Sequence, residues 1–234
     1  MAILFDASSN TSDSSATSLT WDHTCTGADR LLIVGINLHE TTDLDRVVSG
    51  ITYNGVALTQ AKTQVDDSNN ITADLWYLIN PASGQNSVVA SFVGINLFAV
   101  GGAISLTGAD QISQPDATNG ATGSGNPVTV DITTLNDNCW VVDSIFAFAQ
   151  SNTPAEGDGQ VARWVVPIST SHGFGSSEGP KTPAGLVTMS WSNIQAARDW
   201  VTAVASFRPA VATEIAPIIS TSPAIEKQVK ITSY

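Results

Sequence analysis

Short apolar segments recur along this chain, and segments rich in Gly, Asn and Asp separate them. Residues 18–23 alternate between polar and apolar side chains with the period of two that a half-buried strand shows. Residues 30–38 are almost continuously apolar, which predicts a central strand. Asn54 and Gly55 separate two further strand-like segments, and both residue types accept the positive φ angles of a tight hairpin turn. These patterns predict an all-β fold.

The number of strand-like segments indicates the architecture. About a dozen strands joined by polar loops are typical of an antiparallel β-sandwich, here expected to be jelly-roll-like and to span residues 1–208. Residues 8–18, 115–127 and 173–183 are rich in Ser, Thr, Asn or Gly, which predicts turns and loops. Helical periodicity occurs only at residues 192–199. The further predicted strands are 73–79, 87–92, 97–106, 128–132, 140–149, 161–168, 187–191 and 200–207.

The charge balance narrows the classes of partner. The chain has 234 residues, with 9 Lys and Arg against 21 Asp and Glu, which gives a formal net charge of −12. Nucleic-acid binding needs clustered basic side chains, so this composition argues against a nucleic-acid partner. Charged residues make up only 13%, about half of the roughly 25% of an average soluble domain. Neutral polar residues must therefore cover the surface, as they do in extracellular modules and virion shells.

The N-terminal sequence lacks the basic start and the apolar segment of a signal peptide. No segment reaches the roughly 18 consecutive apolar residues of a membrane span, so no membrane partner is expected. A virion protein fits both observations, because virions assemble in the host cytoplasm and leave by lysis. Leaderless export, or a leader missing from this sequence, are the alternatives.

Candidate catalytic and metal-binding motifs are weak. Residues 175–179 match the G-x-S-x-G pattern, but all three histidines precede Ser177 and no helical segment follows it, which favours a Gly/Ser loop. Residues 39–45 contain several carboxylates, but they lack the spacing of a known Ca²⁺ loop. The histidines show no zinc-binding spacing. No catalytic residue, cofactor or metal ligand is therefore expected.

The remaining residue types that can take part in catalysis or binding, which are acids, tryptophans and cysteines, are each explained by a structural role. Asp74 and Asp143 lie within predicted strands and are expected to point to solvent, whereas glycoside hydrolysis would need two acids facing one cleft. The six tryptophans lie on predicted strands or at their ends, which favours core packing over a sugar-binding platform. Cys25 and Cys139 could form at most one disulfide, and Cys139 lies in an apolar segment typical of a buried free thiol.

The C-terminal residues 209–234 differ in character from the rest of the chain. Three prolines interrupt them, which excludes a long helix and disfavours central strands. They are nevertheless too apolar for an idle linker, and we expect an extended assembly arm. The arm could lie on another subunit, fold back over its own sandwich, or be disordered. Its apolar residues are Val211, Ile215, Ile218, Ile219, Ile225, Val229 and Ile231.

One predicted strand is apolar on both faces, since its successive residues Ile145, Phe146, Ala147 and Phe148 all lack polar groups. Residues 97–104 behave similarly. In an antiparallel sheet with one face in water, polar and apolar side chains should alternate along each strand. The second apolar face of this strand must therefore be covered by a loop, by the arm or by another subunit. The sequence has few charges to keep surfaces apart, which favours another subunit and hence a homo-oligomer.

Four segments together resemble a known module. Residues 30–36, 51–59, 75–81 and 200–209 are similar to a concanavalin-like, jelly-roll β-sandwich module of bacteriophage structural proteins and bacterial surface proteins. The resemblance covers roughly residues 1–208, and its motifs are strands and one hairpin. It implies a role in head decoration, a spike, a fibre or a tail in phage, and adhesion or glycan binding elsewhere. It implies no catalytic residues.

These observations predict a non-enzymatic virion structural protein of a bacteriophage: a capsid decoration or cement protein, a head spike or fibre, or a tail component. It would lie on the virion surface as a homo-oligomer, with a trimer favoured, bound to a capsid or tail protein. The alternative is an extracellular, lectin-like adhesion module that binds a surface glycan through an exposed Trp or Tyr. A glycoside-active enzyme is a more distant alternative.

Overall fold

The computed structural model describes residues 2–41 and 46–211. These residues form strands and no helix, as the sequence predicts, and every paired strand runs antiparallel to its neighbour. The largest sheet contains β1 (Leu4–Cys25), β2 (Leu31–His39), β3 (Val47–Tyr53), β4 (Val56–Ala57), β5 (Thr59–Asp66), β6 (Ile71–Ile79) and β7 (Gly84–Thr107). The second contains β8 (Ala117–Ser124), β10 (Cys139–Ala147), β12 (Val161–Ile168), β13 (Ser171–Lys181) and β15 (Asp199–Phe207). The third contains β9 (Val128–Thr133), β11 (Ala155–Glu156) and β14 (Leu186–Ser192).

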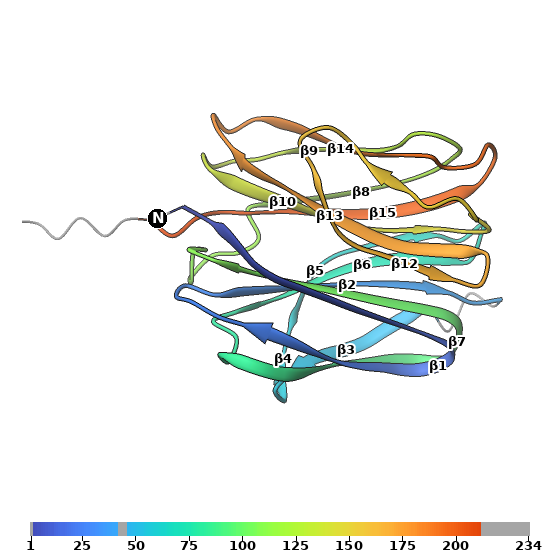
Figure 1. Ribbon diagram of the computed structural model, residues 1–234, viewed down its shortest axis with the longest axis horizontal. Helices are drawn as coiled ribbons and strands as arrows, with labels where there is room; N and C mark the ends of the chain where they lie inside the picture. The colour runs from blue at the N-terminus through green and yellow to red at the C-terminus, as the bar shows by residue number, and fades with distance from the viewer. Residues whose placement is uncertain (1, 42–45, 212–234) are drawn as a thin grey trace, which may run out of the picture.

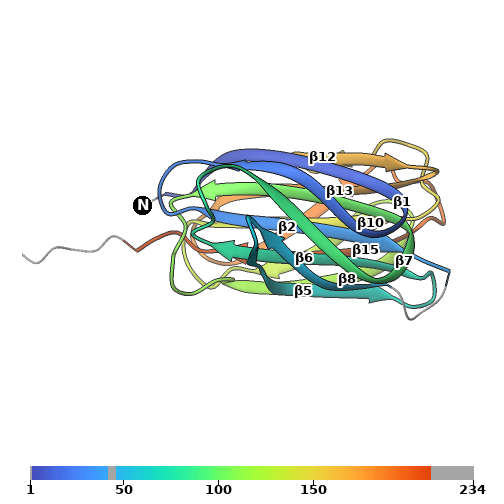
Figure 2. The same cartoon turned by 90° about the horizontal axis from the view of Figure 1, so that it is seen from below.

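The largest sheet folds over itself because its longest strand has two different partners. The first half of β7 pairs with β3, and the second half pairs with β2. Along its other edge β7 pairs with β1 over almost its whole length, so the two strands cross the molecule side by side (Figure 2). Apolar residues of β3 and of the first half of β7 then pack against one face of β2. This folding produces two layers from one sheet.

The described residues therefore form four stacked layers (Figure 1). Layer 1 is β3, β4 and residues 18–25 and 84–93; layer 2 is β2, β5, β6 and the remainder of β1 and β7. Layer 3 is the five-stranded sheet and layer 4 the three-stranded sheet. Layers 2 and 3 are the expected antiparallel sandwich, and layers 1 and 4 cover its outer faces with further apolar cores.

This stacking corrects the interpretation of the two-faced apolar strand, which is β10. Ile145 and Ala147 are fully buried under layer 4, whereas Phe146 is buried in the core between layers 2 and 3. The half-buried Phe148 packs against that same central core. The chain itself covers both faces, so the expectation that another subunit covers them is wrong.

Several polar segments expected to be loops are strands instead. Residues 8–18 belong to β1, residues 117–124 form β8, and most of residues 173–183 belong to β13. Of residues 192–199, the first ends β14 and the last begins β15, and those between form an irregular connection with a turn at 196–197 rather than a helix. Packing explains the glycine-rich strand, because a Cβ added at Gly175 in β13 would lie 2.2 Å from the Trp164 ring. Tertiary packing thus overrides the low strand propensity of glycine.

The sandwich ends just after β15. Pro209 forms a bridge with Ala109, and the N–H of Ala210 donates to the carbonyl of Gly108. Val211 is exposed. The other arm residues, 212–234 with Ile215, Ile218, Ile219, Ile225, Val229 and Ile231, lie outside the described residues. Within the described ranges, no helix is long and apolar enough to cross a membrane.

Candidate functional site

The G-x-S-x-G segment is part of a strand and has no nucleophile-elbow geometry. Ser177 is buried in β13, and its Oγ accepts a hydrogen bond from Arg163 Nε at 2.8 Å. His39 stacks on Phe98 and Phe148, with ring centroids 5.4 and 4.4 Å apart. These residues therefore contribute to packing and strand cohesion, and the segment does not form an esterase-like site.

One serine–histidine pair was missed at the sequence level. Ser9 Oγ and His23 Nδ1 lie 2.8 Å apart on β1, and Trp21 Nε1 donates to the same Ser9 oxygen at 3.1 Å. Burial lowers the pKa of His23 to about 4, although the nearby Asp6 carboxylate acts in the opposite direction. His23 is therefore neutral at pH 7 and a weak general base. The pair was overlooked because residues 8–18 were expected to form a turn.

Asp143 is fully buried, contrary to the expectation that it points to solvent. Its Oδ1 accepts hydrogen bonds from the backbone N–H and the hydroxyl of Ser176, and its Oδ2 accepts one from Trp191 Nε1 at 2.9 Å. Burial raises the pKa of Asp143 to about 6, against the opposing effect of these bonds. The carboxyl group thus connects layer 3 to Trp191 in layer 4 and is not accessible to a substrate.

Asp74 is also buried, on the face of β6 that points toward layer 1. Thr63 Oγ1 and Gln60 Nε2, both from β5, donate to its Oδ1. Its Oδ2 has no hydrogen-bond partner among the described residues. Burial raises the pKa of Asp74 to about 6, and the two bonds only partly offset this effect. Asp74 and Asp143 lie in different cores, so they do not form a catalytic pair.

The described part of the chain contains no group of His, Cys, Asp and Glu side chains that could hold a metal ion. Cys25 and Cys139 are both buried and free, as was expected for Cys139. Burial raises the pKa of both thiols, which for Cys139 reaches about 12. Neither thiol is therefore a reactive nucleophile at neutral pH.

All six tryptophans lie in the described part of the chain, and five of them are buried in the cores. Trp76, on β6, is the exception, because its side chain is only partly buried at the edge of the core between layers 1 and 2. The sequence favoured core packing for the whole set and gave no signal that singled out Trp76. Its exposure depends on the fold of the largest sheet, which leaves β6 near an open edge.

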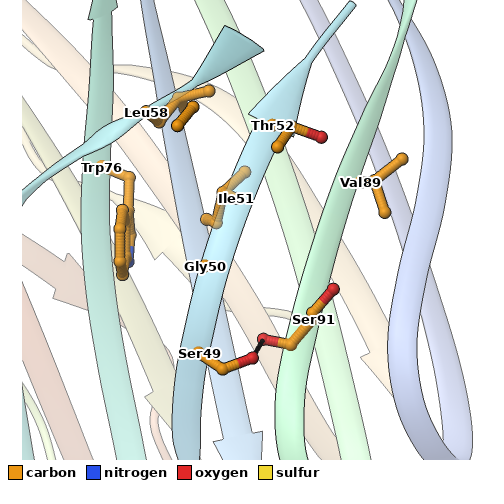
Figure 3. A pocket seen from close by; sticks show the side chains of 9 residues that line it. Ser49, Gly50, Ile51, Thr52, Leu58, Trp76, Val89 and Ser91 are labelled. Carbon is orange, nitrogen blue, oxygen red and sulfur yellow. Dashed lines mark hydrogen bonds between the residues drawn. The ribbon is translucent and has the colours of Figure 1, made fainter. Parts of the chain in front are cut away.

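A hollow of about 480 Å³ extends from Trp76 on β6 across β3 to Val89 and Ser91 on β7 (Figure 3). The indole ring is seen edge-on, and Gly50 and Ile51 lie beside one of its faces. A Cβ added at Gly50 would meet no described atom within 4 Å, so this glycine leaves the space open. Thr52 and Ser91 supply hydroxyl groups to the lining. None of the described residues that line the hollow is ionisable.

The second surface feature is apolar and lies at the end of the stack where both described chain ends meet (Figure 1). It contains the five most exposed large apolar side chains of the described residues, which are 58% to 87% exposed. We call this set the terminal surface; it consists of Leu4, Ile112, Leu135, Leu186 and Val211.

Hydrogen bonds tie the loops of the terminal surface together. Arg208, three residues before Val211, accepts the N–H of Asp110 and donates its own N–H to Gln114, which holds the loop that carries Ile112. Leu135 donates its N–H to Asp116, beyond the same loop. The sequence predicted only Val211 of this set as an assembly residue, because the other four come from separate loops and strand ends.

No protein-family model, curated protein or solved structure matches this chain. The features that the structure itself offers are the hollow beside Trp76 and the terminal surface.

Proposed function

We propose that this protein is a non-enzymatic structural protein of a bacteriophage particle, which assembles and attaches through the terminal surface and the C-terminal arm. The observation that carries the proposal is the gathering of the most exposed large apolar side chains at the end where the arm begins. Exposed apolar groups that gather in one region are typical of protein–protein contact sites, whereas scattered ones are normal on any surface.

The sequence supports the same class of protein. A low charge content and a neutral polar surface are typical of virion shells and extracellular modules, and the four segments described above resemble a module of phage structural proteins. The proposed partners are further copies of this chain, with a trimer favoured, and a capsid or tail protein. The proposed location is the virion surface.

The arm and the terminal surface are tested by light scattering of the purified full-length chain beside a chain that ends at Val211. This end point retains the bonds of Pro209 and Ala210 to the sandwich. We expect the full-length chain to be a trimer or larger, and the shortened chain to remain folded but to be monomeric. Burial of the arm's isoleucines, at roughly 25 cal/mol per Å² before entropic costs, is the expected driving force.

A double variant, Ile112→Ser with Leu135→Ser, tests the terminal surface in the full-length chain. We expect it to weaken the oligomer, whereas Val56→Ser with Val161→Ser, at exposed sites outside the terminal surface, should leave the mass unchanged. A monomeric full-length chain, or an oligomer indifferent to both the truncation and the first double variant, would contradict assembly through this end.

A further inference from the structure

The hollow beside Trp76 has the composition of a site for a neutral, amphipathic ligand. Trp76 and Gly50 both line the open space, and Ile51, Ala57, Leu58 and Val89 supply the rest of the apolar lining. The lining also contains serine and threonine hydroxyls and no ionisable group. A ligand with one apolar face and many uncharged polar groups matches this surface, and a pyranose ring is such a ligand.

We propose that this hollow is a binding site for a neutral saccharide, one sugar ring of which stacks on the exposed face of Trp76. This activity goes beyond the proposed structural role, and it uses the edge between layers 1 and 2 rather than the terminal surface. A particle protein with both features would attach at one place and contact a surface glycan at another.

Polar groups around Trp76 are placed to bind sugar hydroxyls. Gln60 lies directly opposite Trp76 in the β5–β6 pairing, and its exposed side chain is held by the hydrogen bond from its Nε2 to Asp74. On the other side of the hollow, the Ser49 hydroxyl donates to the carbonyl of Ser91 at 3.0 Å, which fixes its orientation (Figure 3). The Nε2 of Gln60 also donates to Thr63, so its Oε1 and the Ser49 oxygen are left as acceptors, whereas the hydroxyls of Thr52 and Ser91 in the lining can donate.

Size and charge restrict the class of saccharide. The volume of about 480 Å³ lies within the roughly 300–1,000 Å³ range of small-molecule sites. The formal net charge of −12 disfavours approach of an anionic glycan, and no cation lines the hollow to offset this repulsion. The proposal is therefore restricted to uncharged sugars.

Isothermal titration calorimetry of the full chain tests the site with four neutral probes: cellotetraose, maltotetraose, xylotetraose and N,N′,N″,N‴-tetraacetylchitotetraose. Tetragalacturonate serves as the anionic comparison. Gly50→Val is the central variant, because Gly50 lines the hollow and has open space at its Cβ, so an added side chain reduces the hollow while Trp76 stays in place. Trp76→Phe retains an aromatic face. Ser12→Val, at an exposed position on β1 outside the lining, is the matched control.

We expect at least one neutral probe to bind the unmodified chain and the control variant with equal affinity. Gly50→Val should weaken that binding about tenfold or more, and Trp76→Phe should weaken it less. Acrylamide quenching of tryptophan fluorescence gives an independent readout on the unmodified chain. Because the other five tryptophans are buried, bound saccharide should protect the accessible fraction, which is Trp76.

Absence of binding by all four neutral probes would overturn the proposal. Binding that Gly50→Val leaves unchanged, or that leaves the quenching of Trp76 unchanged, would place the saccharide elsewhere and overturn it equally. Stronger binding of tetragalacturonate than of every neutral probe would contradict the proposed ligand class. None of these results depends on the oligomeric state, so this proposal and the structural one can fail separately.

Discussion

At the level of single residues, two buried carboxyl groups have similar pKa values but different hydrogen bonding. Burial raises the pKa of both Asp74 and Asp143 to about 6. Asp143 uses both oxygens as acceptors, whereas Asp74 uses only Oδ1 among the described partners. An amide can therefore replace the Asp74 carboxyl group more easily than the Asp143 carboxyl group.

Asp74→Asn should stabilise the protein at neutral pH and not at acidic pH. The unfolded chain ionises Asp74 near its ordinary pKa of 3.8, but the folded chain does so only near 6. Stability is therefore lost as the pH rises from 3.8 to about 6, and the loss is complete above that window. The full loss corresponds to roughly 3 kcal/mol, which the variant avoids. Urea unfolding of both proteins between pH 4 and 8 measures the difference.

Asp143→Asn is the contrasting variant, because an amide at that position cannot accept from both Ser176 and Trp191 Nε1. We expect it to be about 1–3 kcal/mol less stable than Asp74→Asn at neutral pH. Asp13→Asn, at an exposed position, controls for the change in net charge. Equal stability of Asp74→Asn and the unmodified chain at every pH would show that burial does not penalise the Asp74 carboxylate.

At the level of strands, tryptophans on one strand occupy spaces that glycines leave on others. Trp164 on β12 packs over Gly35 of β2, Gly102 of β7 and Gly175 of β13, so one indole contacts strands of layers 2 and 3. A Cβ at Gly102 would lie 2.2 Å from the ring. The glycines are therefore required by packing against the indole and not by backbone turns.

Gly102→Ala should destabilise the protein by about 1–3 kcal/mol, because the added methyl group forces Trp164 out of its site. Gly50→Ala is the matched control, also a strand glycine but with open space at its Cβ, and it should be nearly neutral. Thermal unfolding of both variants measures the effect. Similar melting temperatures for the two would mean that Trp164 repacks without cost.

The same glycines explain which strands were predictable. Apolar or alternating segments such as β2 and β10 were identified from their patterns alone, and the Asn54–Gly55 hairpin was also correct. Strands β8 and β13 were expected to be loops because Gly, Ser and Thr are common in turns. Their strand conformation depends on contacts with Trp164 of the adjacent strand β12 and with Trp200 and Trp140, which are distant in sequence. A local pattern contains no information about such partners.

At the level of the whole molecule, the sequence was sufficient for the fold class but not for the number of layers or the candidate sites. A strand that is apolar on both faces indicates that both faces are covered, but its sequence does not indicate which part of the molecule covers them. The hollow beside Trp76 and the terminal surface each combine residues from several strands and loops. Only the folded chain brings these residues together, so neither site has a continuous motif.

The stacked layers should unfold together. Layers 2 and 3 each contribute to two cores, so separating any layer exposes apolar surface on its neighbour. We predict a single calorimetric transition of the shortened chain that ends at Val211, with equal calorimetric and van't Hoff enthalpies. Phe146→Ala in the central core and Trp191→Phe under layer 4 should both shift that one transition. If two transitions were seen, and each variant shifted a different one, the central core and the core under layer 4 would unfold independently.

Both described chain ends lie at the same end of the stack, and this arrangement determines where the protein could carry a foreign peptide. The β12–β13 turn at Ser169 and Thr170 lies at the opposite end of the stack from Leu4 and Val211, and both turn residues are exposed. Exposed turns of this kind tolerate insertions. A peptide inserted there would be displayed outward on an assembled particle, whereas one fused next to Val211 would be placed against the attachment surface. The stack would then serve as a spacer that holds its cargo a full strand length away from its support.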